Sequence, residues 1–184
     1  MDADILFIMD SSYEVNQEEY KSEKDFIKSL IRSLNVSLDT SRAALISYGD
    51  LGSLNSRFIG LKSLSDFDKL VDNATYVGGE RRIDRALEKS TQILNEARAG
   101  SSKFVIFLTG GRQASSGKPL DEVVGPLREN GVKTYVITIG KKSDAQELRP
   151  LVASPEDLVS LHSFKELNSQ ISKIASHISE KAGK

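Results

Sequence analysis

Residues 3–15 read ADILFIMDSSYEV, and this stretch decides the fold. Its apolar run ILFIM has no polar alternation, which is the pattern of a strand buried on both faces of a parallel sheet. The run ends at Asp10, Ser11 and Ser12, so a carboxylate and two hydroxyls follow the carboxyl end of the strand. Ligands of open α/β sheets bind at that edge. We therefore predict a central strand with a functional site directly after it.

Size, charge and cysteine content exclude several classes of protein. The 184 residues fit a single domain, expected over residues 1–184, and suffice to bury roughly 70% of the unfolded surface. With 25 basic and 26 acidic residues, the net charge of -1 argues against nucleic-acid partners. No apolar run reaches the roughly 20 residues that cross a bilayer, so no membrane insertion is expected. Without Cys, disulfides and thiolate metal sites are excluded.

The start of the chain carries one further indication. Met1 and Asp2 directly precede the core strand. This arrangement indicates a domain taken from a longer protein.

Strands and helices alternate along the rest of the chain. Further strands are predicted at residues 42–48, 54–61, 103–109, 132–139 and 158–162, and helices at 17–34, 65–73, 83–94, 119–129, 143–150 and 163–178. Only five residues separate the strands at 42–48 and 54–61, too few for a parallel crossover. The prediction is a Rossmann-like, doubly wound α/β fold. Its mostly parallel six-stranded sheet has one antiparallel edge strand and helices on both faces.

Capping residues mark where the helices begin. Asn16, with a Glu three residues on, has the pattern of a capping box, and Ser163 repeats that pattern. Ser65 and Ser143 are expected at the starts of two short helices. The helix predicted at 119–129 has Pro119 near its first turn and a Gly past its end.

Three phrases, ILFIMDSS, YVGG before a helix, and FVIFLTGGR leading to VKTYVITIG, occur in the order of the predicted elements. Together they resemble the von Willebrand factor type A domain family over nearly the whole chain. Within that family the chain is most similar to the tandem A domains of collagen VI, such as the N-terminal array of its alpha-3 chain. The resemblance implies the fold predicted above.

The resemblance also implies a metal site, which the family builds from Asp-x-Ser-x-Ser after the first strand, a Thr after Gly-Gly, and a second Asp after a later strand. Asp10 and Ser12 match this pattern. However, Glu14 stands in the position of the second Ser, Arg81 in that of the Thr, and Gly110 in that of the second Asp. Because Mg²⁺ prefers oxygen ligands, a guanidinium in place of a ligand leaves a poor pocket. We predict a degenerate site with no bound metal and no cofactor.

A buried Asp10 needs a partner, because an unpaired buried carboxylate is costly. Arg81, or Arg82 beside it, is predicted to reach across the sheet edge to Asp10 and Glu14. The other interpretation is that Arg81 points into solvent at a helix start. Both interpretations stay open from the sequence.

Two alternative functions compete with this prediction. One is a metal-dependent adhesion domain in which Asp10, Ser12 and Glu14 are ligands. The other is a nucleotide-binding enzyme, since residues 111–118 lie between a strand and a helix, as a phosphate-binding loop does. The glycine spacing of that loop is one residue too long, and Pro119 replaces the Mg²⁺-binding hydroxyl. A solvated loop is the simpler interpretation.

Enzymatic function is not predicted. Ser11 and Ser12 lack a Gly-x-Ser-x-Gly elbow. His162 and His177 are expected at the far edge of the sheet and off the inward helix face, as ordinary surface or partly buried residues.

The resemblance implies a non-enzymatic, secreted interaction module of the extracellular matrix. Its partners would be matrix proteins, collagens and neighbouring domains of the same chain, in microfibril assembly and cell adhesion. Asn35 and Asn73 begin two N-glycosylation sequons, both at predicted helix ends, which favours a secreted protein.

Overall fold

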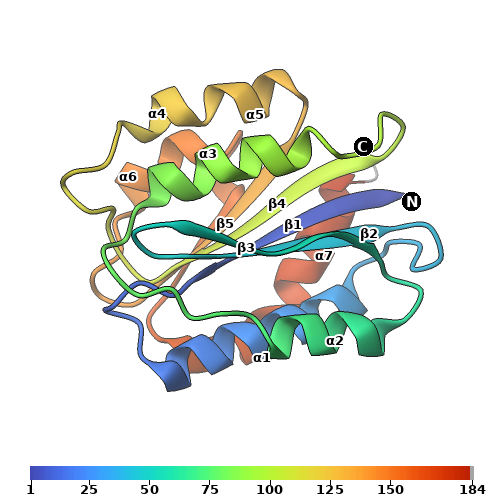
Figure 1. Ribbon diagram of the computed structural model, residues 1–184, viewed down its shortest axis with the longest axis horizontal. Coiled ribbons are helices and arrows are strands. Elements are labelled where there is room, and N and C mark those ends of the chain that lie inside the picture. Colours follow the sequence, from blue (N-terminus) through green and yellow to red (C-terminus); the bar gives the residue numbers. More distant parts are fainter. Residues whose placement is uncertain (183–184) are drawn as a thin grey trace.

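The computed structural model describes the backbone of residues 1–182 and, within that range, all side chains except those of Ser53, Leu54 and Ala182. Its core is a six-stranded sheet in the order β3-β2-β1-β4-β5-β6 (Figure 1). The strands are β1 (Ala3–Asp10), β2 (Arg42–Tyr48), β3 (Gly52–Gly60), β4 (Ser102–Thr109), β5 (Lys133–Ile139) and β6 (Leu158–Leu161). Five run parallel, and β3 pairs antiparallel with β2 at the edge. The predicted fold class and the position of the antiparallel strand are confirmed.

Helices cover both faces of the sheet (Figure 1). One layer contains α1 (Gln17–Ser33), α2 (Leu64–Asp72) and α7 (Ile171–Ala182); we call it the α1–α2–α7 layer. The opposite α3–α6 layer contains α3 (Ile83–Leu94), α4 (Leu120–Val123), α5 (Gly125–Glu129) and α6 (Ala145–Leu148). Short 3-10 turns lie at Arg149–Leu151, Pro155–Asp157, Phe164–Glu166 and Asn168–Gln170.

Strand β1 is the centre of the fold, as its apolar run predicts. All eight of its residues are buried, and β2 and β4 flank it in parallel. Ile5, Phe7 and Met9 belong to the core under the α1–α2–α7 layer. Leu6 and Ile8 belong to the core under the α3–α6 layer. The strand must therefore be apolar on both sides, because each side of it faces a helix layer.

The predicted helix at 119–129 is wrong as a single element. The structure divides it into α4 and α5, with Pro126 in the first turn of α5. Proline has no N–H to donate to the carbonyl four residues before it, so it interrupts the first helix and is tolerated in the first turn of the second. Gly131, just beyond α5, has φ +70, a conformation that favours glycine.

Three of the predicted caps are also corrected. The capping box at Asn16 is present, but α2 begins at Leu64 after Ser63, one residue before the expected Ser65. Helix α6 is capped by Asp144, whose carboxylate accepts from two backbone N–H groups; Ser143 is not the cap. The Ser163 side chain makes no cap hydrogen bond, and a 3-10 turn follows it. Asp and Ser are both favoured at the N-cap, so the residue types alone do not distinguish Asp144 from Ser143 as the cap of α6.

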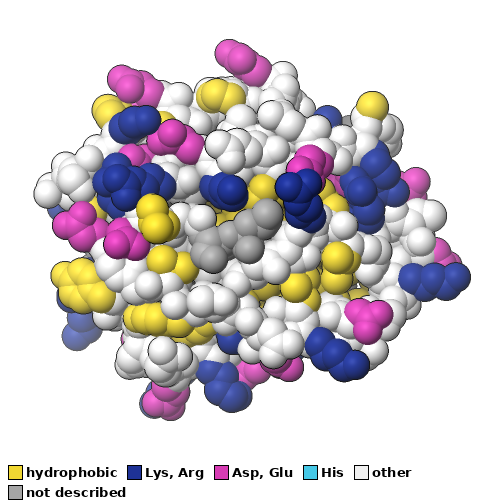
Figure 2. All heavy atoms as spheres, viewed as in Figure 1, with side chains coloured by type: hydrophobic (Ala, Val, Ile, Leu, Met, Phe, Trp, Pro, Cys, Tyr) yellow, Lys and Arg dark blue, Asp and Glu magenta, His cyan; other side chains and the backbone are white. Residues whose placement is uncertain are grey.

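Within the described residues, no helix combines the length and apolar character needed to cross a bilayer. On the face seen in Figure 2, basic and acidic side chains are interspersed, with no broad area of one sign. This distribution agrees with the near-zero net charge.

Candidate functional site

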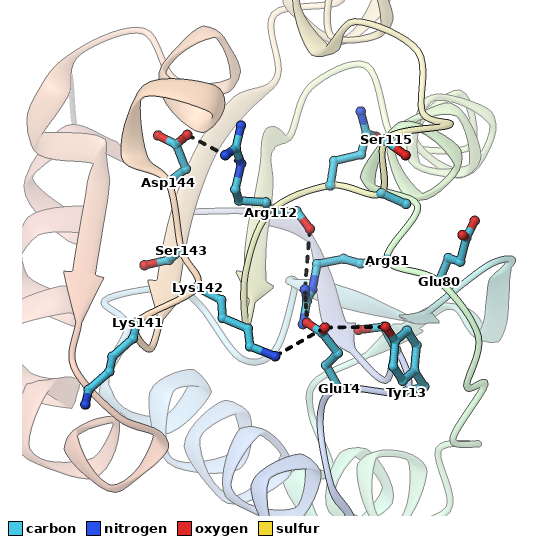
Figure 3. A pocket seen from close by; sticks show the side chains of 13 residues that line it. Tyr13, Glu14, Glu80, Arg81, Arg112, Ser115, Lys141, Lys142, Ser143 and Asp144 are labelled. Atoms are coloured by element: carbon cyan, nitrogen blue, oxygen red, sulfur yellow. Dashed lines mark hydrogen bonds and ion pairs between the residues drawn. The ribbon is translucent and has the colours of Figure 1, made fainter.

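Four loops meet at the carboxyl edge of the parallel strands and enclose a hollow of about 590 Å³. They follow β1, precede α3, follow β4 and follow β5 (Figure 3). The hollow is lined by Ser12, Tyr13, Glu14, Glu80, Arg81, residues 112–115 and residues 141–144. The sheet edge predicted from residues 10–12 is thus the floor of an open depression lined mostly by polar and charged residues.

Asp10 lies fully buried beneath this hollow, and four donors satisfy its carboxylate. Oδ1 accepts from the backbone N–H of Ser12 at 2.9 Å and from the Ser12 hydroxyl at 2.7 Å. Oδ2 accepts from Arg81 Nε at 2.7 Å and from the Gly110 N–H at 2.7 Å. Both oxygens are therefore occupied by protein N–H and O–H groups.

Arg81 bridges two carboxylates. Its Nη1 lies 3.2 Å from Glu14 Oε2, in addition to the Nε contact with Asp10. Only 5% of its side chain is exposed. Burial alone would lower the pKa of Arg81, but the charges of Asp10 and Tyr48 and the hydrogen bonds to Asp10 and Glu14 together raise it above its ordinary value. The predicted ion pair of Arg81 with Asp10 and Glu14 is confirmed, and Arg81 does not point into solvent.

Glycines give the Arg81 side chain its room. A Cβ atom on Gly111 would lie 2.6 Å from Arg81 Nη1, and one on Gly110 would lie 3.3 Å from Nη2. Gly78 and Gly79, just before Arg81, have φ +77 and +76, which side-chain-bearing residues rarely adopt. The loop that delivers the guanidinium therefore depends on glycines on both sides of it.

Glu14 forms the rim of the site. Lys142 Nζ lies 3.2 Å from Glu14 Oε1, while Arg81 contacts the other oxygen (Figure 3). Burial alone would raise the pKa of Glu14, but Lys142 and Arg81 lower it below its ordinary value. Glu14 is thus held ionised between two cations.

Arg82 has a different partner from its neighbour. Its guanidinium pairs with the buried carboxylate of Asp84, with Nη2–Oδ2 at 2.8 Å. Asp84 Oδ2 also accepts from the N–H of Lys118 at 2.9 Å. The alternative assignment of Arg82 as the partner of Asp10 is therefore wrong.

The loop at 111–118 is neither a phosphate cradle nor simply solvated. Gln113 Oε1 accepts from the N–H of Asp84 at 2.7 Å, and the Gln113 N–H donates to Glu147 Oε1 at 2.7 Å. The Ala114 N–H donates to the carbonyl of Arg81 at 2.8 Å. Because a carboxylate and a carbonyl already accept from the N–H groups of Gln113 and Ala114, these two groups are not free to bind a phosphate.

Glu23 of α1 is a site residue that the sequence argument missed. Its Oε1 accepts from the Asp10 N–H at 2.7 Å, and the side chain is fully buried. No protein group is hydrogen-bonded to its Oε2 within the described residues. Burial, and next the charge of Asp10, raise the pKa of Glu23 well above its ordinary value. The available signal was its position three residues after Tyr20, on the inward helix face.

The remaining predicted positions lie away from this site. Asn35 and Asn73 are exposed and follow α1 and α2. His162 is exposed beyond β6. His177 lies on α7, and its Nε2 is 2.7 Å from Oδ1 of Asp157. Ser11 is fully buried, with its hydroxyl donating to the Tyr48 carbonyl at 3.1 Å. In the described part of the chain, no Ser–His pair is thus assembled at the carboxyl edge.

Collagen VI chains and a matrilin are among the proteins that this chain resembles. It is 27% identical over 154 residues to the collagen alpha-4(VI) chain of Mus musculus, covering 82% of this chain and 6% of that protein. It is 26% identical over 161 residues to matrilin-2 of Mus musculus, covering 84% of this chain and 16% of that protein. The chain thus spans a small part of the length of the relatives it matches.

Solved structures agree on the fold. Proximal thread matrix protein 1 from the mussel byssus superposes with a TM-score of 0.90 at 22% identity, covering 97% of this chain and 48% of that chain. The sequence model described as the von Willebrand factor type A domain matches residues 4–176. The predicted resemblance, including the likeness to collagen VI domains, is confirmed. The chain belongs to the von Willebrand factor type A domain family.

Proposed function

We propose that this domain is a non-enzymatic interaction module of a secreted extracellular matrix protein and that it binds its partners without a metal ion. Its homology to A domains of collagen VI and matrilin supports the matrix assignment. The partners we expect are matrix proteins, collagens and neighbouring domains of the same chain, in microfibril assembly and adhesion. The observation that carries the metal-free part is the Arg81–Asp10 ion pair.

The residues present do not fit a divalent cation. Asp10 already accepts four hydrogen bonds, and a cationic guanidinium lies 2.7 Å from Oδ2. A metal ion at this carboxylate would have to take the place of the Arg81 guanidinium. The guanidinium would then lose its partner and lie, nearly buried, beside a second cation. Among the described residues, no group of three or more acidic or His side chains is arranged to hold a metal ion. One structure of the byssus protein is described with zinc in its adhesion motif, so the proposal separates this chain from that relative.

Calorimetric titration with Mg²⁺ and Mn²⁺ tests the metal-free part. We expect no heat of binding at millimolar metal from the natural chain. The matched control is the triple variant Glu14→Ser, Arg81→Thr, Gly110→Asp, which restores the ligand pattern of the family. Binding of metal by the natural chain, abolished in Asp10→Ala, would instead favour the metal-dependent adhesion domain with Asp10, Ser12 and Glu14 as ligands.

Solid-phase binding to purified collagen VI and collagen I tests the interaction part. We expect saturable binding that is equal in EDTA and in Mg²⁺. Loss of binding in EDTA would contradict the metal-free proposal. Failure to bind either collagen in either buffer would contradict the assignment of collagens as partners.

A further inference from the structure

Four exposed asparagines lie at or just after helix ends in this fold. Those of the two layers differ in whether a Ser or Thr follows two positions on. Asn73 and Asn95 cap α2 and α3, Asn130 caps α5, and Asn35 follows the cap of α1. Asn35 and Asn73 have a hydroxyl residue two positions on. Asn95 is followed by Ala97 and Asn130 by Val132, so neither can be a sequon. The two acceptor sequences therefore lie only on the α1–α2–α7 layer.

The middle residue of each sequon lies against the core. In 35–37 it is Val36, which packs against the core beneath the α1–α2–α7 layer. In 73–75 it is Ala74, which is 7% exposed in the same core. Asn35 and Asn73, which directly precede these two residues, are both exposed.

From this shared geometry we propose that Asn35 and Asn73 are sites of N-linked glycans and that carbohydrate covers only the α1–α2–α7 layer. The inference rests on the proposed function, because the modification requires passage through the secretory pathway. The donor is a lipid diphosphate oligosaccharide. Asparagine Nδ2 forms a bond to C1 of the first sugar and loses one proton. The bond from C1 to the phosphate oxygen breaks, and the lipid diphosphate leaves with its electron pair.

The layout has a consequence for partner binding. Glycans at Asn35 and Asn73 occupy the ends of α1 and α2, whereas the α3–α6 layer and the loops around the hollow carry no sequon. Partner proteins are therefore expected on the α3–α6 layer.

The test is secretion of the full 184-residue chain from mammalian cells behind a heterologous signal peptide, followed by glycosidase digestion and glycopeptide mass spectrometry. We expect two glycans, with one lost in Asn35→Gln and the other in Asn73→Gln. Ser37→Ala and Thr75→Ala remove the same glycans while keeping each asparagine, which separates loss of the sugar from loss of a helix-end residue.

Ala97→Thr is the matched positive control, because it completes a sequon at Asn95, the equivalent helix end on the opposite layer. If Asn95 of this variant is glycosylated while Asn35 and Asn73 of the natural chain are not, the inference is overturned. That result would leave the proposed function intact, because metal-free binding to collagen is measured separately. Modification of a single native site would overturn the claim for the other.

Discussion

The two ends of β1 each bury an aspartate against arginine, but they do so in opposite ways. At the base, Asp4 is paired with both Arg42 and Arg98, at 2.8 and 2.6 Å, and these arginines are 27% and 39% exposed. At the carboxyl edge, the single arginine Arg81 is 5% exposed and serves two carboxylates. One end has two partially solvated cations for one acid, and the other has one buried cation for two acids.

This difference indicates where the molecule tolerates change. If Arg42 or Arg98 is lost, the other still neutralises Asp4, and both are partly exposed to water. Among the described residues, the other donors to Asp10 are the neutral Ser12 hydroxyl and the N–H groups of Ser12 and Gly110, so none of them replaces the charge of Arg81. We therefore expect the ion pairs of Arg81 with Asp10 and Glu14 at the carboxyl edge to stabilise the fold.

Replacing Arg81 should give the largest effect. Arg81→Ala leaves Asp10 buried without its cation, so we expect a loss of about 3–5 kcal/mol in unfolding free energy. Urea denaturation followed by circular dichroism measures it. The control is Arg112→Ala, at the same edge but 67% exposed with ion-pair distances of 3.6 and 3.8 Å, which should cost less than about 1 kcal/mol. Equal losses in the two variants would contradict the comparison.

The two ends should also respond oppositely to pH. Burial raises the pKa of Glu23, so the folded state binds more protons than the unfolded state above pH 4.5 and stability falls as pH rises. Arg42 and Arg98 outweigh burial and hold the pKa of Asp4 well below its ordinary value. The stability from Asp4 is therefore present above pH 3.8 and is lost as pH falls below it.

Glu23→Gln isolates the carboxyl-edge contribution. The unfolding free energy of this variant relative to the natural chain should rise with pH above 4.5, by at most about 1.4 kcal/mol per pH unit. Urea titrations from pH 4 to 9 measure the difference. A difference that does not change with pH would show that Glu23 is ionised in the folded protein.

Replacing the arginines that pair with Asp4 should destabilise the fold less, because each can substitute for the other. We expect Arg42→Ala and Arg98→Ala each to cost about 1 kcal/mol, because the remaining guanidinium keeps Asp4 paired. The double variant should cost more than the sum of the singles, with a coupling between 0.5 and about 3 kcal/mol. Strict additivity in this double-mutant cycle would argue against redundancy at the base.

The smallest effect belongs to the rim of the hollow. Lys142 is 70% exposed and contacts Glu14, which keeps its bond to Arg81. Lys142→Ala should therefore cost less than about 1 kcal/mol, and added salt should mask the loss. A loss of unfolding free energy as large as that of Arg81→Ala would show that Glu14, and not Asp10, is the carboxylate on which the stability of this network depends.

Local patterns in the sequence determined much of the architecture. The apolar run of β1, the capping box at Asn16 and the short connection before β3 act over a few residues, so they are readable without the fold. The same holds for the alignment that placed Arg81 and Gly110 in the positions of the metal ligands. The break before Pro126 was readable in the same way but was missed.

Tertiary structure decided what lies between distant segments. Arg81 is 71 residues from Asp10, and whether it or Arg82 faces the carboxylate depends on the glycine turn at 78–79 and on the approach of residues 110–111. The burial of Glu23 under Asp10 likewise requires α1 to dock on the sheet. Sequence determined the strands, most of the helices and the family, because apolar periodicity and short motifs are local. Only the folded chain determined which charges meet, because the direction of a side chain at a loop is set by the segments packed around it.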